Sequence, residues 1–433
     1  MRIYFKYYLI FLILFQIHDA SASYRCESLF NSNYFNQAIK GKSVDTFQLF
    51  LEFENVYNRP IYSRPVLNLK MNASPVSKKS INVNLFGSKD QNQILQKILF
   101  INPVQVLWFK HPFNTDSSVP YYRQKETDAL DVYMSSSRSM IFSLNDEFYS
   151  IRTPTDQPRG VFDSEGYKKT IIGPELKIAI AQMQLVNQVE NQFGFTKNVI
   201  LAKEIAVIQN TVSKKSKDVN TDDSGYMIRD LSFLKNKNKY YMPAFSVETV
   251  GKIIAKKHGE KFSEFWLIRY AENLGRVKAQ LLIHYGLHME FPHGQNLIIE
   301  LDHHLMPTGR FVLRDIDDMS QYTPVLEAMN EVFNEQSVTQ INIDRNNQRD
   351  DIDLYWRRFS SRVFTWSEDP HVYSKKIYNQ WESAHEDAFI KEVAKLLDVR
   401  SKELGKNIQE VSRTLSSTWG ISLIKQYFYK KYK

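Results

Sequence analysis

The chain has 433 residues, of which 43% are hydrophobic and 24% charged, so it has enough apolar surface for a substantial core, and a disordered protein is excluded. The formal net charge of +8 is modest for this length, and no zinc-finger, helix-turn-helix or RNA-binding signature is present. We therefore expect an anionic small ligand and no nucleic-acid partner. The single cysteine, Cys26, excludes a disulfide within the chain.

The first 22 residues have the pattern of a secretory signal peptide. Arg2 and Lys6 precede an apolar core at residues 9–15, and the small residues at 20–22 fit a cleavage site. This core is far shorter than the ~20 residues that a helix needs to span a bilayer, and no later segment is long and apolar enough to span one. We therefore expect an exported protein, periplasmic or extracellular, with no spanning segment, and a cytoplasmic location is the alternative.

Patterning divides the rest of the chain into four expected regions. Residues 23–130 alternate short aromatic runs with polar loops, which indicates a compact mixed α/β cap. Residues 131–210 combine strands with a helix, residues 211–345 carry most of the candidate functional side chains, and residues 346–433 have helical periodicity.

Two strands and two long helices are predicted on the N-terminal side of these residues. The strands fall at residues 139–144 and 148–151, and apolar residues at helical spacing place a helix at about 175–193. A second helix is expected at 262–285, because its apolar side chains share one face and Gly286 follows as a C-cap. This helix leads directly into the candidate site.

The candidate functional side chains gather around one predicted β-hairpin. Residues 297–301 form an apolar strand, residues 306–309 carry a turn signal, and residues 310–314 resume strand-like alternation. Two antiparallel strands place the start of the first beside the end of the second. We therefore expect polar side chains from both ends to lie together, namely His293, Gln295 and Asn296 with Arg314, Asp315, Asp317 and Asp318.

Beyond Asp318 the pattern changes to helices. Thr323 is a predicted N-cap with Pro324 at the first helical position, and residues 381–397 have the periodicity of an amphipathic helix. Together the elements predict an α+β fold with several lobes, in which a central antiparallel sheet carries the site and helices form the C-terminal region.

One order of motifs resembles a known family. Glu290, His293-Gly294-Gln295-Asn296, an apolar strand, a turn, a second strand and Arg314-Asp315 resemble the palm-domain signature of the NRPS-independent siderophore synthetases, the aerobactin-synthetase (IucA/IucC) type. The resemblance covers roughly residues 135–319. It implies an ATP-dependent ligase for siderophore biosynthesis and iron acquisition. Such a ligase activates a carboxyl group of citrate or a related acid as an acyl-adenylate, which an amine or hydroxyl then attacks.

Other stretches extend the resemblance. Residues 135–138 resemble the family's Ser-x-Arg element, which touches nucleotide and carboxylate, and Arg152 stands where the family has a lysine. Residues 202–204 and 224–230 resemble a later pair of segments, Ala-Glu-Pro and Ile-Arg-Glu. By the resemblance, residues 131–210 are a fingers-like region that binds nucleotide and carboxylate, and residues 211–345 are the palm.

The resemblance implies ATP and Mg²⁺ and three sets of site residues. The catalytic set is His293, Arg138 and Lys169, the nucleotide-binding set is Ser136, Arg138, Arg152, Lys168, Gln295 and Arg314, and the metal-binding set is Glu290, Asn296 and Asp315. Joining a carboxylate to ATP brings polyanions together, so cationic side chains and a divalent cation must offset their charge. Magnesium prefers oxygen ligands, and His293 would donate a hydrogen bond to an oxyanion.

Each of these residues also has a plainer interpretation. His293 follows a proline, as turn residues often do, and Arg314-Asp315 could be a simple ion pair at a strand end. Lys168-Lys169 is typical of a solvated pair, and residues 135–137 of a polar loop.

Departures from the family pattern keep other functions open. The chain is shorter, it lacks the family's N-terminal phosphate-gripping segment, and Glu290 lies one residue farther from His293. ATP is also scarce outside the cytoplasm. Enzymatic activity is therefore undecided, and an exported, catalytically degenerate member that binds a carboxylate or ferric chelate is the alternative. A phosphotransferase is a third interpretation, although Gly294-Gln295 supplies no aspartate base. The expected partners are a small carboxylate and an amine or hydroxyl compound, and a homo-oligomer is left open.

Overall fold

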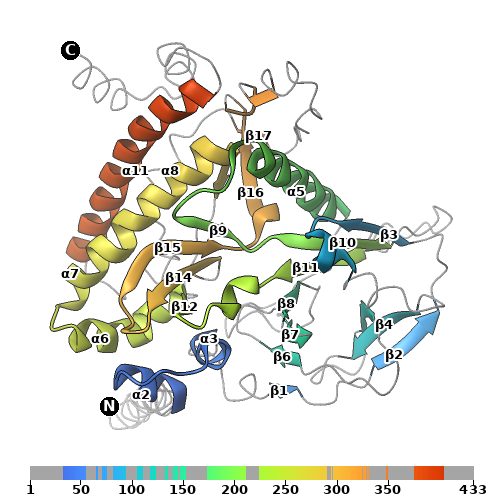
Figure 1. The fold of residues 1–433 in the computed structure, drawn as a ribbon, viewed down its shortest axis with the longest axis horizontal. Helices are drawn as coiled ribbons and strands as arrows, with labels where there is room; N and C mark the ends of the chain where they lie inside the picture. The colour runs from blue at the N-terminus through green and yellow to red at the C-terminus, as the bar shows by residue number, and fades with distance from the viewer. Residues whose placement is uncertain are drawn as a thin grey trace, which may run out of the picture.

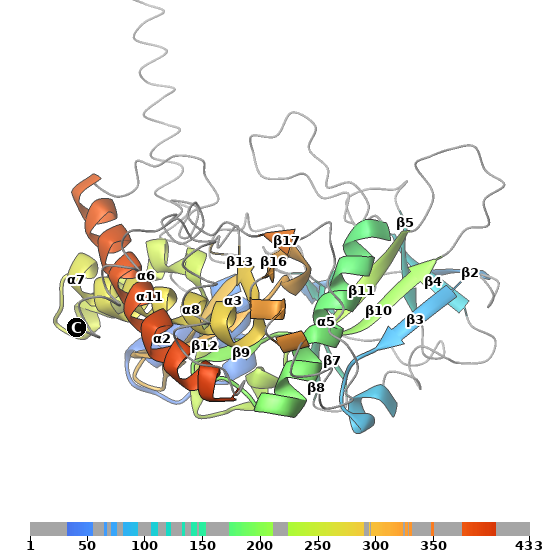
Figure 2. The ribbon, with the colours of Figure 1, turned by 90° about the horizontal axis from the view of Figure 1, so that it is seen from above.

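Helices and mainly antiparallel sheets make up the protein, which confirms the predicted α+β fold class and the helical C-terminal region. The computed structural model describes residues 33–54, 65–66, 71–75, 81–93, 105–110, 118–122, 132–134, 140–144, 147–152, 173–210, 224–289, 294, 296–323, 325–327, 329–330, 348–349 and 375–403. Helices α6, α8 and α11 lie at one end of the molecule, and a seven-stranded sheet with α5 lies at the other (Figures 1 and 2).

The largest sheet has seven strands, and each neighbouring pair in it is antiparallel. In spatial order these strands are β1 (Pro65–Val66), β6 (Val132–Met134), β7 (Met140–Leu144), β8 (Glu147–Arg152), β11 (Ser224–Asp230), β10 (Glu204–Asn210) and β3 (Ile81–Leu85). The predicted strands at 139–144 and 148–151 are confirmed as β7 and β8. Helix α5 (Gly173–Phe193), predicted at 175–193, covers β10 and β11 through Leu176 and Ala179.

A four-stranded sheet carries the predicted hairpin. Its order is β12 (Lys239–Pro243), β14 (Leu297–Asp302), β15 (Pro307–Leu313) and β9 (Val199–Leu201). Strands β14 and β15 pair antiparallel, with Leu297 opposite Leu313, and β9 joins β15 in parallel. Strand β14 is buried from Leu297 to Leu301, which explains why four of these five residues are apolar, and β15 is buried only over its last three residues.

The hairpin turn, predicted at residues 306–309, lies earlier, so that prediction was wrong. The Asp302 carboxylate accepts the backbone N–H groups of His304 and Met306, both at 2.8 Å, and this fixes the chain reversal. Leu305 takes a left-handed conformation (φ 66°) and is fully buried, so its burial helps to offset the backbone strain. Pro307 therefore begins β15 instead of the turn.

The predicted helix at 262–285 is continuous but not uniform. It consists of α7 (Phe262–Trp266), a π-helical segment η4 (Leu267–Glu272) and α8 (Asn273–Tyr285), and it follows α6 (Val247–Lys257). Gly286 ends it at φ 65°, the left-handed conformation expected of a C-cap, and its N–H bonds to Leu282 O at 2.9 Å. The chain then enters β13 (Leu287–Met289).

Helix α11 (Lys375–Glu403) contains the predicted helix at 381–397 and packs along α8. Gly275 permits this close approach, because a Cβ there would lie 2.2 Å from His385 O. No helix of the described segments has both the length and the apolar character needed to span a membrane.

The remaining elements complete the surroundings of the hairpin. They are α2 (Asn33–Ile39), α3 (Thr46–Glu54), the short helices η2 (Ser232–Lys235), η3 (Ala244–Ser246) and η5 (Ile316–Asp318), the sheet β13, β16 (Met319–Tyr322) and β17 (Gln348–Arg349), and the sheet β2 (Met71–Pro75), β4 (Gln105–Lys110) and β5 (Ser118–Tyr122). Helix α3 packs on the four-stranded sheet, where Phe47, Phe50 and Leu51 meet Ile298 and Val312. An N-terminal helix thus lies against the hairpin that carries the site.

Candidate functional site

The open end of the hairpin brings together the two sides of the predicted site. Asn296 precedes β14 and Arg314 follows β15, and Arg314 N donates to Asn296 O at 3.1 Å. The antiparallel pairing therefore extends one residue beyond Leu297 and Leu313. Asn296, Arg314 and Asp315 are all buried, with 2%, 3% and 8% exposure. The prediction that residues from these two ends lie side by side is confirmed for Asn296 and Arg314.

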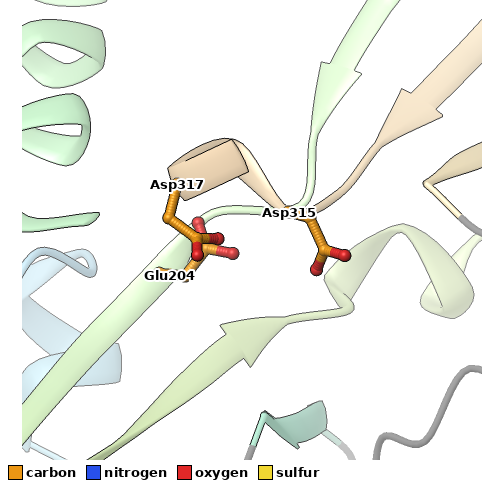
Figure 3. A group of neighbouring side chains, drawn as sticks. All are labelled: Glu204, Asp315 and Asp317. Atoms are coloured by element: carbon orange, nitrogen blue, oxygen red, sulfur yellow. The ribbon is translucent and has the colours of Figure 1, made fainter. Parts of the chain in front are cut away.

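Three buried carboxylates meet just beyond the hairpin, and we call them the acidic group: Glu204, Asp315 and Asp317 (Figure 3). Each offers one oxygen within 4.8 Å of the other two. Glu204 begins β10, whereas Asp315 lies between β15 and η5 and Asp317 lies within η5. Asp315 adopts φ 63° and ψ 54°, a left-handed conformation that aspartate tolerates better than most residues. This turn brings Asp315 and Asp317 back toward β10.

The side chain of Arg229 joins two members of the acidic group. Arg229 faces Glu204 across the β10–β11 pair and is 1% exposed. Its Nε and Nη2 donate to Glu204 Oε1 at 3.1 and 2.9 Å, and Nη2 also contacts Asp315 Oδ1. The strand pairing thus fixes a guanidinium between two carboxylates that are distant in sequence.

Burial raises the pKa of the Glu204 carboxyl to about 7, well above its ordinary value. The Arg229 guanidinium opposes this shift, and the carboxylates of Asp317 and Asp315 add to it. Among the described residues, no group donates a hydrogen bond to Glu204 Oε2, although this oxygen is buried. A buried anionic oxygen without a donor is costly, and a proton or a cation at Oε2 would offset that cost. Carboxylate oxygens are the ligands that magnesium prefers, and the acidic group therefore fits a divalent cation.

Arg314 has a different counter-charge. Its Nη1 lies 2.7 Å from Oε1 of Glu54, the last residue of α3, and both side chains are buried. The sequence predicted that Arg314 offsets charge on a nucleotide, and that role stays a prediction. The structure shows that this guanidinium is already paired with a carboxylate of the protein.

Of the other predicted site residues, the structure describes Arg152 and Asn296 and leaves the rest outside the described residues. Arg152 ends β8 and is paired with Met227 of β11, two residues from Arg229 along that strand. Asn296, predicted as a metal ligand, has a buried Oδ1 that no described group meets with a hydrogen bond. Outside the described residues lie Ser136, Arg138, Lys168, Lys169, Glu290, His293 and Gln295. Gly294, beside His293, is described, and its carbonyl accepts the N–H of Phe245 at 3.3 Å.

Sequence reasoning assigned no site role to four residues that meet here. Glu204 and Arg229 stood in the two segments, 202–204 and 224–230, whose likeness to the synthetase family was noted, and that likeness was the available signal. Asp317 was placed at the hairpin end without a function. Glu54 had no signal, because nothing in the sequence around it indicates a partner at the end of the hairpin.

Similar proteins were found among solved structures. No protein-family model matches the chain, and no curated protein matches it. Among solved structures, the aerobactin synthetase IucA from a hypervirulent pathotype of Klebsiella pneumoniae matches with TM-score 0.51 and 11% identity over 92% of this chain and 75% of that one. Its ATP-bound form matches with TM-score 0.48 and 10% identity, over 90% and 75%. The petrobactin biosynthesis protein AsbB from Bacillus anthracis matches with TM-score 0.45 and 15% identity, over 88% and 67%.

The match to IucA shows that the chain has a fold similar to that of an aerobactin synthetase. The identity of 11% supports this relation in fold and nothing finer.

Proposed function

We propose that this protein is an ATP-dependent ligase that activates a carboxylate, citrate or a related acid, and condenses it with an amine or hydroxyl. The observation that carries the proposal is the buried acidic group at the open end of the hairpin, in a fold shared with an aerobactin synthetase. The residues there include Asn296, Arg314 and Asp315, which the sequence had selected for the same chemistry.

In this proposal the acidic group holds Mg²⁺, with Asn296 Oδ1 as a further oxygen ligand. A bound magnesium ion would offset the negative charge of phosphate and carboxylate groups. Arg229 orients the Glu204 and Asp315 carboxylates through its hydrogen bonds. His293 would donate a hydrogen bond to an oxyanion, and Arg138 and Lys169 would bind the anionic substrates.

One observation favours a second candidate, an exported protein that binds a carboxylate or ferric chelate without turnover. Arg229 already offsets part of the negative charge of the acidic group, and a proton on Glu204 would offset more. The cluster could therefore remain buried without a metal ion, as a structural network does. The predicted signal peptide at residues 1–22 agrees with this alternative.

The products of a single assay separate these functions. The purified protein is incubated with ATP, Mg²⁺, citrate and either a diamine or a hydroxylamine, and pyrophosphate, ADP and thermal stability are followed. A ligase releases pyrophosphate when the acid is present, because the acyl-adenylate then forms, and it needs the amine or hydroxyl compound to release AMP and turn over repeatedly. Thermal stabilisation by citrate without turnover supports the binding protein, and ADP release indicates phosphotransfer. Absence of nucleotide binding in the presence of Mg²⁺ would count decisively against a ligase.

A matched pair of variants tests the site itself. Asp315→Asn removes one carboxylate of the acidic group and is expected to abolish pyrophosphate release. Asp302→Asn makes the same change at the other end of the hairpin, where an asparagine can still accept the backbone N–H groups of His304 and Met306. This control is expected to retain activity, and equal loss in both variants would mean that folding alone was disturbed.

A further inference from the structure

Two adjacent residues of α5, Gln182 and Met183, contact the two parts of the chain that supply the acidic group. Both side chains are fully buried. Gln182 Nε2 donates to the carbonyl oxygen of Met319 at 2.7 Å, and Met319 directly follows η5, which carries Asp317. Met183 Sδ accepts the backbone N–H of Glu204 at 3.2 Å. Neighbouring residues of one helix therefore contact both sides of the acidic group.

The segment that carries Asp315 and Asp317 depends on outside contacts for its position. The short helix η5 is a single turn closed by the Met319 N–H, and Asp315 precedes it at φ 63°. A left-handed conformation of this kind persists only where the surrounding structure holds it. The Gln182 amide supplies such a contact on the residue that ends the turn, and its Oε1 also accepts Gln321 Nε2 at 2.9 Å. Both ends of one amide thus hold η5 and β16 against α5.

Strand pairing does not reach the carboxylates themselves. The parallel pairing of β9 with β15 ends before Glu204 and Asp315, so other contacts must set the spacing of the acidic group. Arg229 supplies one of them, because its guanidinium bonds to both carboxylates, and α5 supplies the other. Spacing matters for the choice of ion. Mg²⁺ demands near-ideal octahedral geometry at about 2.0–2.1 Å, whereas Ca²⁺ accepts irregular geometry at about 2.3–2.6 Å.

We propose that Gln182 is a positioning residue that sets the spacing of the acidic group and thereby its preference for a small divalent cation over a larger one. The inference rests on the proposed function, because it assumes the cation site described there. Gln182 holds the side of Asp315 and Asp317, while Met183 holds the backbone of Glu204. The strand β16 does not depend on this contact for its existence, because it also pairs with β13.

Displacement of Mn²⁺ from the full chain by Mg²⁺ or by Ca²⁺, followed by electron paramagnetic resonance, provides the test. It is made at pH 8, above the pKa of about 7 of Glu204. Gln182→Met keeps the length of the side chain and removes both hydrogen bonds of the amide. Affinity for Mg²⁺ is expected to fall about tenfold or more, as it does when the supports of metal ligands are removed. Affinity for Ca²⁺ should change by less than about threefold, because Ca²⁺ adapts to a looser site.

The matched control is Gln280→Met, the same change at another buried glutamine. Gln280 Nε2 donates to Glu392 Oε1 of α11 at 2.9 Å. This control removes a buried hydrogen bond between α8 and α11, and both affinities should stay within about twofold. Gln182→Asn is a milder variant that keeps the amide and shortens its reach. If Gln182→Met does not fold, Gln182→Asn decides, and its ratio of Mg²⁺ to Ca²⁺ affinity should fall by about threefold or more.

The ratio of Mg²⁺ to Ca²⁺ affinity distinguishes positioning from a merely structural role. A ratio that does not fall in the Gln182 variant, including equal weakening of both ions, would overturn the assignment, as would an equal fall in Gln280→Met. These results would leave the proposed function intact. Absence of Mn²⁺ binding by the unsubstituted protein would instead remove the cation site itself, and with it both the inference and the proposed function.

Discussion

The raised pKa of Glu204 gives a direct test of the electrostatics of the site. Burial shifts this pKa from 4.5 to about 7, so the folded protein holds a proton there that the unfolded chain releases between these values. Stability from this group is fully present below pH 4.5 and is lost as the pH rises through 7. Each pKa unit corresponds to about 1.4 kcal/mol, so the loss across the window is about 3 kcal/mol, most of it between pH 5 and 8.

Glu204→Gln removes this titration and keeps a group of similar size. We expect the free energy of unfolding of the unsubstituted protein, measured in urea at pH 5 and pH 8, to fall by about 2–3 kcal/mol more than that of the variant. Glu264→Gln, on a side chain that is 65% exposed, should leave the difference between the two pH values unchanged. The reasoning is refuted if Glu204→Gln and the unsubstituted protein lose the same free energy. Mg²⁺ at pH 8 should stabilise the unsubstituted protein and not the variant.

Three further predictions concern the helices that support the site. Burial lowers the pKa of Lys278 to about 7, so the free energy of unfolding should rise as the pH goes from 7 to 10.5. In urea titrations Lys278→Met should not show this rise, and it should be more stable than the unsubstituted protein at pH 7 by roughly 1–4 kcal/mol. Lys395→Met, at a side chain 70% exposed, should change neither the pH dependence nor the stability at pH 7. Gly275→Ala would force its Cβ to 2.2 Å from His385 O and should cost about 3 kcal/mol by thermal melting. Gly286→Ala, at φ 65°, should cost about 1 kcal/mol in the same measurement.

The sequence predicted those parts of the site that depend on residues close together in the chain. The apolar run of β14 and the alternation of β15 predicted a hairpin, and the antiparallel geometry then placed Asn296 beside Arg314. The Pro-Thr-Gly signal at residues 307–309 misplaced the turn. The chain reverses before Pro307, because the Asp302 side chain accepts the backbone N–H groups of His304 and Met306. The turn signal was real, but a stronger local hydrogen-bond pattern lay a few residues earlier.

Long-range charge pairing could not be predicted in the same way. Glu54 meets Arg314 because α3 packs its aromatic face on the four-stranded sheet, and this packing depends on the complete tertiary fold. Arg229 meets Asp315 because the end of β15 lies against the β10–β11 pair. A single sequence gives the charge of each residue and leaves its partner undetermined.

The arrangement of charges explains why one cluster can serve two kinds of protein. In a low-dielectric interior the negative charge of the acidic group can be offset by a proton, by Arg229 or by a metal cation. Each of these makes the binding of the others less favourable. Above about pH 7 the Glu204 carboxyl loses its proton, so Arg229 or a cation must then offset more of the negative charge of the acidic group.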